Sequence, residues 1–254
     1  MSLEEKIDKT AYKDEFKEMT FLEHLEELRW TIIKSLIGIV VAAVISWIFI
    51  DRIVNDILLY PAVRFGVKLQ NLKPFGQLFL YFQVALMSGV ILSLPWIVYQ
   101  IWKFIEPALH RHEKKYVSLI VIFTSLSFII GALFAYFVML PYSLNFAFTF
   151  GTEEIENRFA IDEYLSIVIS MIILSGVVFE LPMLSFFLTK LGLLTPKILR
   201  KYWRYAIVII LILSALITPT VDPVSQSLLA IPLFLLYEIS IWISKISMRK
   251  KSEG

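Results

Sequence analysis

The sequence of 254 residues contains no cysteine, which excludes a disulfide framework and any metal site built on thiolates. It also lacks the common catalytic patterns: a glycine-rich phosphate loop, a His-Glu-x-x-His helix and a nucleophile elbow are all missing. Charged residues are scarce, at 18% of the chain against about 25% in an average soluble domain. From these absences we expect neither an enzyme nor a metal or organic cofactor.

The first 29 residues also lack an apolar stretch, and they carry nine acidic and five basic residues. A secretory signal peptide needs an apolar central region, so the sequence predicts that no signal peptide is cleaved here. We expect residues 1–20 to form a cytoplasmic extension, residues 21–244 a membrane domain and residues 245–254 a cytoplasmic tail.

The chain is instead rich in apolar residues, since 58% of its residues are hydrophobic. A helix that crosses the hydrocarbon needs roughly 20 apolar residues, and aromatic residues gather at the ends of such runs as they do at membrane interfaces. The predicted fold is therefore an all-α membrane protein with six transmembrane helices. The apolar runs cover residues 35–50 (extending back to 30), 78–102, 116–152, 164–189, 205–221 and 223–237. In the third run we expect Pro141 to end the span near Leu140.

The distribution of Lys and Arg predicts the orientation, since cytoplasmic loops carry the excess of these residues. Alternate connecting segments, beginning with the N-terminal one, hold eighteen of them, and the opposite segments hold five. Both termini are therefore predicted to lie in the cytoplasm, which an even number of spans satisfies.

The last two spans are short in the sequence. Their 17 and 15 uncharged residues cover about 26 and 23 Å at 1.5 Å per residue, whereas a hydrocarbon core is about 30 Å thick. Such a mismatch thins the bilayer or recruits partners. The alternative is that Glu238 reaches the interface and the sixth helix continues to Ser244.

Acidic residues precede the first span on a helix whose other face is apolar. Thr20 and Glu23 fit a capping box, so an amphipathic helix is expected to begin here on the inner membrane surface. Glu27 lies off its apolar face. Carboxylates at this place suit a cationic partner, although they could also pair with Lys and Arg of the same chain.

The first cytoplasmic loop repeats this pattern. Glu113 lies in a basic and aromatic context and could pair with Arg111 or Lys115, or join Glu27 in a two-carboxylate site. Two carboxylates suit guanidinium groups, which they bind bidentately. His110 and His112 could reach a metal, but no third ligand is evident, and solvated histidines are the simpler interpretation.

Glu180 lies inside the fourth apolar run, two residues before Pro182. A carboxyl group at this depth must face protein or water, and it marks a functional site by default. A proton or cation site, a polar contact with another membrane protein and a buried structural hydrogen bond all remain possible. Thr218 and Gln226, near the outer ends of the last two spans, are weaker polar marks.

Six stretches, in order along the chain, resemble the TatC family, the multispanning receptor of the twin-arginine protein translocase. They include residues 24–29 (HLEELR), 99–105 (YQIWKFI), 131–137 (GALFAYF), 179–182 (FELP), 195–196 (TP) and 218–219 (TP), each followed or preceded by further matches. One region departs, because residues 74–79 (PFGQLF) lack an acid that the family often has before the second span.

The resemblance implies six spans in a concave, glove-like arrangement in the cytoplasmic membrane, and a receptor for folded cargo exported at the expense of the proton-motive force. It assigns Glu27 and Glu113, with Arg29 and Phe104 nearby, to binding the paired arginines of a signal peptide. It further implies single-span partner subunits, a homo-oligomer within the receptor complex, and no nucleic acid. Intramembrane polar contacts with partners would involve Glu180, Gln226 and Thr218, and the external loops would contribute Pro61 and Asp222.

A proton-coupled transporter of a small solute, with Glu180 as its proton site, is the alternative. Such transporters are typically built from repeated halves around a polar midplane. Neither a repeat nor a midplane acidic cluster is visible in this sequence.

Overall fold

The computed structural model describes residues 21–66, 68–105, 117–149, 158–190, 192–218 and 222–252. At residues 21, 117–119, 148 and 249–252 only the backbone is described. Within these ranges five helical stretches are long and apolar enough to cross a membrane, and a sixth apolar helix is shorter. The six runs of the sequence therefore all become helices.

The long helices follow the predicted runs closely. They are α2 (Phe21–Ile48), α5 (Gly76–Ile105), α7 (Val117–Phe134), α9 (Ile161–Val178) with α10 (Leu181–Lys190), and α13 (Pro223–Ser252); the shorter apolar helix is α12 (Trp203–Ile217). Short elements connect them: α3 (Ile50–Arg52), the π-helix η1 (Ile53–Leu58), α4 (Tyr60–Arg64) and α11 (Pro196–Lys201).

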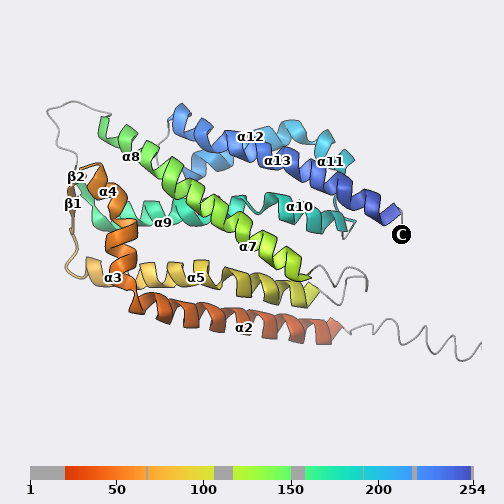
Figure 1. Ribbon diagram of the computed structural model, residues 1–254, viewed down its shortest axis with the longest axis horizontal. Helices are drawn as coiled ribbons and strands as arrows, with labels where there is room; N and C mark the ends of the chain where they lie inside the picture. The colour runs from red at the N-terminus through yellow and green to blue at the C-terminus, as the bar shows by residue number, and fades with distance from the viewer. Residues whose placement is uncertain are drawn as a thin grey trace, which may run out of the picture.

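The helices form an open row (Figure 1). Among the described elements, α2 packs extensively on α5, α5 also contacts α7 and α9, and α13 packs on α10 and α12. The α9 helix lies in the middle of this row and is the most buried span. The apolar core lies where α5, α9, α13 and the π-helical turn η3 (Ala135–Met139) of the third span meet, around fully buried residues such as Val168, Leu229 and Leu233.

The molecule has two ends (Figure 1). We call the end that carries the start of α2, the helix α11 and the end of α13 the terminal end. The opposite end, the strand end, carries α3, α4, α8 (Leu140–Thr149) and two short strands, β1 (Lys68–Gln70) and β2 (Arg158–Ala160). The start of α2 and the end of α13 thus lie on the same side of the molecule, as an even number of crossings requires.

Close backbone approaches fix the helix pairs. At Gly89 of α5, an added Cβ would lie 2.7 Å from the backbone of Ala43 on α2. At Gly131 of α7, it would lie 2.7 Å from the carbonyl oxygen of Ser175 on α9, and the Ser175 hydroxyl donates a hydrogen bond to the Gly131 carbonyl at 2.9 Å. Small residues at such contacts are what membrane helices use to pack closely.

The third span does not end at Pro141, so that expectation was wrong. The helix α7 passes through a π-helical turn, η3 (Ala135–Met139), and continues as α8. Pro141 has no amide hydrogen to donate to the preceding turn. The wide turn immediately before it, in which Leu140 N–H donates to the Ala135 carbonyl, accommodates the proline without breaking the helix.

The sixth helix is not short, because α13 runs without interruption past Glu238 and Ser244 to Ser252. The alternative of a continuing helix is therefore correct for this span, and the helix also crosses the expected boundary between domain and tail. Only α12 remains short: its 15 residues cover about 22 Å.

The strand end contains the elements that the sequence did not predict. The strands β1 and β2 pair in parallel, with Leu69 opposite Phe159, and so join two loops that are distant in sequence. Beside them, Pro61 lies buried in the first turn of α4. Since Pro61 lacks an amide hydrogen, the Ile57 carbonyl one turn earlier receives its hydrogen bond from the Tyr136 hydroxyl, at 2.7 Å.

Candidate functional site

An acidic face runs along the first turns of α2 at the terminal end. Glu23, Glu26, Glu27, Trp30 and Lys34 line a shallow, open hollow of about 320 Å³. Their spacing of three, four, seven and eleven residues places them on one side of a helix. Thr20, the predicted cap, lies outside the described residues, and the uninterrupted start of α2 brings three carboxylates together on one surface.

Glu27 differs from its acidic neighbours on this surface because it is half-buried while they are exposed. Its Oε2 atom is fully buried and has no hydrogen-bond partner within the described part of the chain. A buried carboxylate oxygen without a partner costs free energy, more than a neutral group would. The atom is thus available to a cationic hydrogen-bond donor, and pairing with a described Lys or Arg of the same chain is not seen.

Phe104 is brought to this surface by the second span. Its ring stacks on the ring of His24, with centroids 4.4 Å apart and the planes inclined by 21°. The contact joins the start of α2 to the last turn of α5. Two residues before Phe104, Trp102 is buried and packs edge-on against Phe187 of α10, with ring centroids 5.1 Å apart, which fixes the end of α5 against the rest of the fold.

Two further predicted site residues lie differently. Arg29 is exposed and is absent from the hollow's lining, because residues two apart on a helix do not face each other. Glu113 lies outside the described residues, as do His110 and His112. Of the four predicted residues, Glu27 lines the hollow, and Phe104 adjoins the start of α2 through its stack on His24.

Glu180 lies at a break between two helices. The helix α9 ends at Val178 and α10 begins at Leu181, with Pro182 in its first turn. Pro182 cannot donate to the Val178 carbonyl. The chain responds with a tight turn in which Glu180 N–H donates to the Val177 carbonyl, at 3.1 Å.

The side chain of Glu180 is half-buried, and its Oε1 atom is buried without a hydrogen-bond partner within the described residues. Phe179, the preceding residue, packs against Phe134 of α7, with ring centroids 5.7 Å apart. The backbone of Phe128 on α7 interacts with the same carboxyl group, so Glu180 has one contact within the chain and one oxygen atom without a described partner. Its carboxyl group is held in place by the break and is open to an additional contact.

Thr218 and Gln226 make hydrogen bonds within the last hairpin, which α12 and α13 form. The Thr218 hydroxyl donates to the Ser214 carbonyl of its own helix, at 2.8 Å. The Gln226 amide donates to the Leu211 carbonyl of α12, at 2.9 Å. The packing of the fourth span on the last one is made by α10, where Thr189 donates to Ser244 at 2.8 Å, and no described hydrogen bond links Glu180 to Thr218 or Gln226.

Asp222 is buried and caps α13, since its Oδ2 atom accepts a hydrogen bond from Ser225 N–H at 2.7 Å. Aspartate is one of the residues preferred at this N-cap position of helices. Pro61, described above, likewise has a local structural role at the strand end. Neither residue lies near the acidic face of α2, which is at the other end of the molecule.

The structure adds residues that the sequence argument did not select. Glu23 and Glu26 line the same hollow as Glu27, and their helical spacing was the signal that could have identified them. At the strand end, Lys73 and Asp162 form an ion pair, and sequence gave no sign of it because 89 residues separate them. Over the described ranges, no group of three or more His, Asp or Glu side chains is arranged to hold a metal ion.

The fold and this surface define a class of protein: a multispanning α-helical membrane protein with an acidic face at the end where its first helix begins and its last helix ends. The model of one family, the Sec-independent protein translocase protein TatC, matches residues 23–232. The TatC protein of Aquifex aeolicus is 39% identical over 239 residues, which cover 92% of this chain and 98% of that protein. The TatC protein of Carboxydothermus hydrogenoformans is 35% identical, with 94% and 98% covered.

Solved structures agree. A crystal structure of the twin-arginine translocase receptor TatC superposes with a TM-score of 0.77 at 38% identity and covers 89% of this chain and all of that one. A second, in DDM, gives 0.78 at 38% identity, with 87% and 99% covered. This chain belongs to the TatC family. The prediction of six helices in the family's arrangement is confirmed, and the alternative of a small-solute transporter loses its support.

Proposed function

We propose that this protein is the receptor subunit of a Sec-independent translocase in the cytoplasmic membrane. In this role it binds the twin-arginine signal peptides of folded cargo and provides the platform on which single-span partner subunits and further copies of itself assemble. Transport is driven by the proton-motive force. The family, the solved structures and the number of spans support this function, and its finer points rest on the surfaces described above.

The observation that carries the proposal is the buried Oε2 atom of Glu27, which lacks a partner among the described residues and adjoins a hollow lined by two more glutamates. A guanidinium group supplies a planar set of donors that a carboxylate accepts two at a time. The stack of His24 on Phe104 adds an aromatic edge to the same surface. We assign Glu113 to the second carboxylate and Arg29 to the surroundings of the site, as the family resemblance implies.

The proposed orientation places the terminal end, and hence both termini, in the cytoplasm. The helix α11 at this end has Lys197, Arg200 and Lys201 within six residues, and all three are exposed. Cysteine labelling in intact cells tests this orientation. Lys197→Cys should be protected from an impermeant reagent, whereas Asn157→Cys should react; an external Lys197 would overturn the six-span orientation.

Recognition is tested by a double cycle that changes the protein and the peptide separately. Binding of a signal peptide with an arginine pair, and of the same peptide with a lysine pair, is measured for the intact protein and for Glu27→Gln and Glu113→Gln. Breaking a desolvated charge pair costs about 2–5 kcal/mol, and an exposed pair about 0–1 kcal/mol. Because Glu27 is half-buried, we expect an intermediate loss of about tenfold to a hundredfold for the arginine peptide.

The lysine peptide should bind weakly to all three proteins, with little change on mutation. Asp56→Asn, an exposed carboxylate at the strand end, is the matched control and should bind both peptides normally. Equal losses for both peptides, or unchanged arginine-peptide affinity in both Gln variants, would contradict the assignment of the site.

A further inference from the structure

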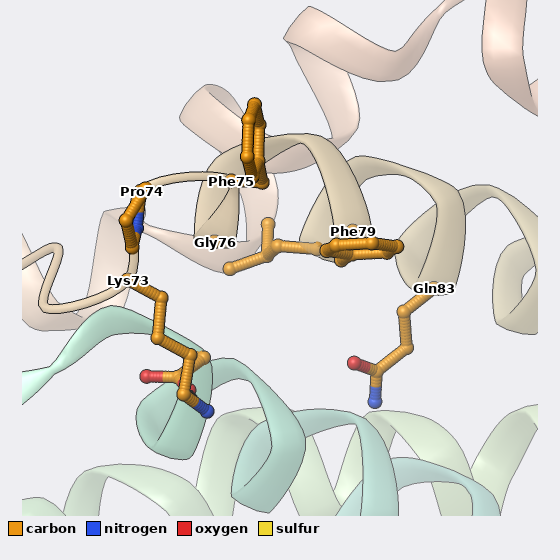
Figure 2. A pocket seen from close by; sticks show the side chains of 8 residues that line it. Lys73, Pro74, Phe75, Gly76, Phe79 and Gln83 are labelled. Carbon is orange, nitrogen blue, oxygen red and sulfur yellow. Dashed lines mark hydrogen bonds and ion pairs between the residues drawn. The ribbon is translucent and has the colours of Figure 1, made fainter.

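A second hollow lies at the strand end, between the start of α5 and the start of α9. It has a volume of about 470 Å³ and is lined by Lys73, Pro74, Phe75, Gly76, Phe79, Leu80, Gln83 and Asp162. This volume is within the range of small-molecule sites, about 300–1,000 Å³. Figure 2 shows the side chains of Lys73 and Gln83 directed to the same side of α5, toward α9, with Phe79 between them.

The rim of this hollow carries both signs of charge. The Lys73 ammonium group donates a hydrogen bond to Asp162, and this bond, with the charge of Asp162, raises the pKa of Lys73. The lysine side chain is 70% exposed and the aspartate 25%, so both charges can contact a ligand. The rim thus offers one cation and one anion at the level where the spans begin.

The wall below the rim is apolar except for one amide. Phe75 and Phe79 are about two-thirds exposed and Leu80 is buried. Gln83 lies seven residues into α5, about 10 Å along the helix from its start, and its side chain is exposed. An amide exposed at membrane depth is costly unless it finds a hydrogen-bond partner.

We propose that this hollow binds a phospholipid whose headgroup has a primary ammonium, as in phosphatidylethanolamine. The lipid phosphate lies against Lys73, the ammonium against Asp162, and the chains against Phe79 and Leu80. The Gln83 amide donates to an ester carbonyl, which lies deeper in the bilayer than the phosphate. The site is independent of signal-peptide recognition, since it lies at the opposite end of the molecule.

The charges on the rim favour this ligand over three others. An anionic lipid gains from Lys73 but is repelled by Asp162 and by the exposed Glu163 next to it. A lipid with a quaternary ammonium has no N–H to donate to Asp162. A peptide helix would cover the aromatic wall but would leave the paired charges of the rim without matching groups.

The test is native mass spectrometry of the purified full chain titrated with phosphatidylethanolamine, phosphatidylcholine and phosphatidylglycerol. The hydrogen bond to Asp162 that a quaternary ammonium cannot donate is worth about 1 kcal/mol net, or about fivefold in affinity. We therefore expect the intact protein to prefer phosphatidylethanolamine about fivefold over phosphatidylcholine. Asp162→Asn should abolish this preference. Lys73→Gln should lower the affinity for all three lipids by a similar factor.

Gln83→Leu separates the deep contact from the rim and exchanges a side chain that faces outward, so the fold is retained. In this variant the affinity for the diester lipid should fall to that for a diether analogue, which lacks the ester carbonyl. The preference among headgroups should stay unchanged. Arg64→Gln, an exposed cation on α4, is the matched control and should bind like the intact protein. Equal binding of all headgroups, a preference for phosphatidylglycerol, or a photocrosslink from position 79 to a peptide or a second copy in place of lipid would overturn the proposal.

Discussion

The two ends of the molecule differ in how their polar groups are hydrogen-bonded. At the strand end, atoms that the local backbone leaves unpaired find partners on distant segments: the Ile57 and Leu58 carbonyls accept hydrogen bonds from Tyr136 and Tyr164, at 2.7 and 2.9 Å. At the terminal end and at the break in the fourth span, Glu27 and Glu180 each keep a buried carboxylate oxygen that no described residue satisfies.

This difference separates structural polar groups from those available to a partner. A buried polar atom without a hydrogen bond costs about 1–3 kcal/mol, and more when charged. At the strand end, the Tyr136 and Tyr164 hydroxyls avoid this cost for the two backbone carbonyls. The carboxylates of Glu27 and Glu180 avoid it only by contact with something outside the described residues, which is the behaviour expected of binding sites.

The largest expected effect is that of Glu180→Leu. We expect this variant to lose crosslinks to single-span partner subunits, and with them transport, because the carboxyl group is the polar contact at the break. Stability should not fall, since a charged side chain inside the membrane costs about 2.5–3.5 kcal/mol on insertion scales. Crosslinking yield and the thermal midpoint of unfolding are the two measurements.

Glu180→Gln is the matched control and should retain much of the crosslinking, because the amide still donates and accepts hydrogen bonds. Signal-peptide binding should be normal in both variants. Lost peptide binding with persistent partner crosslinks would mean that the roles of Glu27 and Glu180 are reversed.

A smaller effect, confined to stability, is expected at the strand end for Tyr136→Phe. Removing this hydroxyl leaves the Ile57 carbonyl without its donor, at a cost of about 1–3 kcal/mol in the free energy of unfolding. In a Pro61→Ala background the new alanine amide can donate to the same carbonyl. The cost of Tyr136→Phe should therefore shrink there, which a double-mutant cycle in denaturant measures. Equal costs in both backgrounds would show that Pro61 does not create the need for the tyrosine.

The smallest effect is expected for Arg200→Gln. Arg200 Nη1 lies 3.3 Å from Glu238 Oε1, and both side chains are more than half exposed. An exposed ion pair contributes about 0–1 kcal/mol, so the thermal midpoint should barely move. A large loss of stability would show that exposed pairs hold the terminal end together, and would weaken the contrast with the strand end.

The sequence predicted the spans because apolar runs of sufficient length are read from composition alone. It did not predict the break before Pro182, although the missing amide hydrogen of this proline acts within one turn. It failed at Pro141, because the π-helical turn that accommodates this proline depends on geometry and not on composition. It failed at the strand end as well, since β1 and β2 have three residues each and pair only because the folded spans bring them together.

The site was predictable to a similar degree. Glu27 and Glu180 stood out because carboxylates are rare in or beside apolar runs, and the resemblance supplied their proposed ligands. The surroundings were not predictable: the stack of His24 on Phe104 joins residues 80 positions apart, and the side on which Arg29 lies follows only from the helix. Thr218 and Gln226 looked like partner contacts but make hydrogen bonds within the last hairpin.

The open row of helices also bears on how the chain enters the membrane during synthesis. The first span has its extensive described contacts with α5 alone, and the tight approach at Gly89 and Ala43 lies within this pair. All of these contacts exist once the first 105 residues have been translated. The α2–α5 hairpin can therefore leave the insertion machinery as a packed unit, with no need to wait for helices encoded downstream.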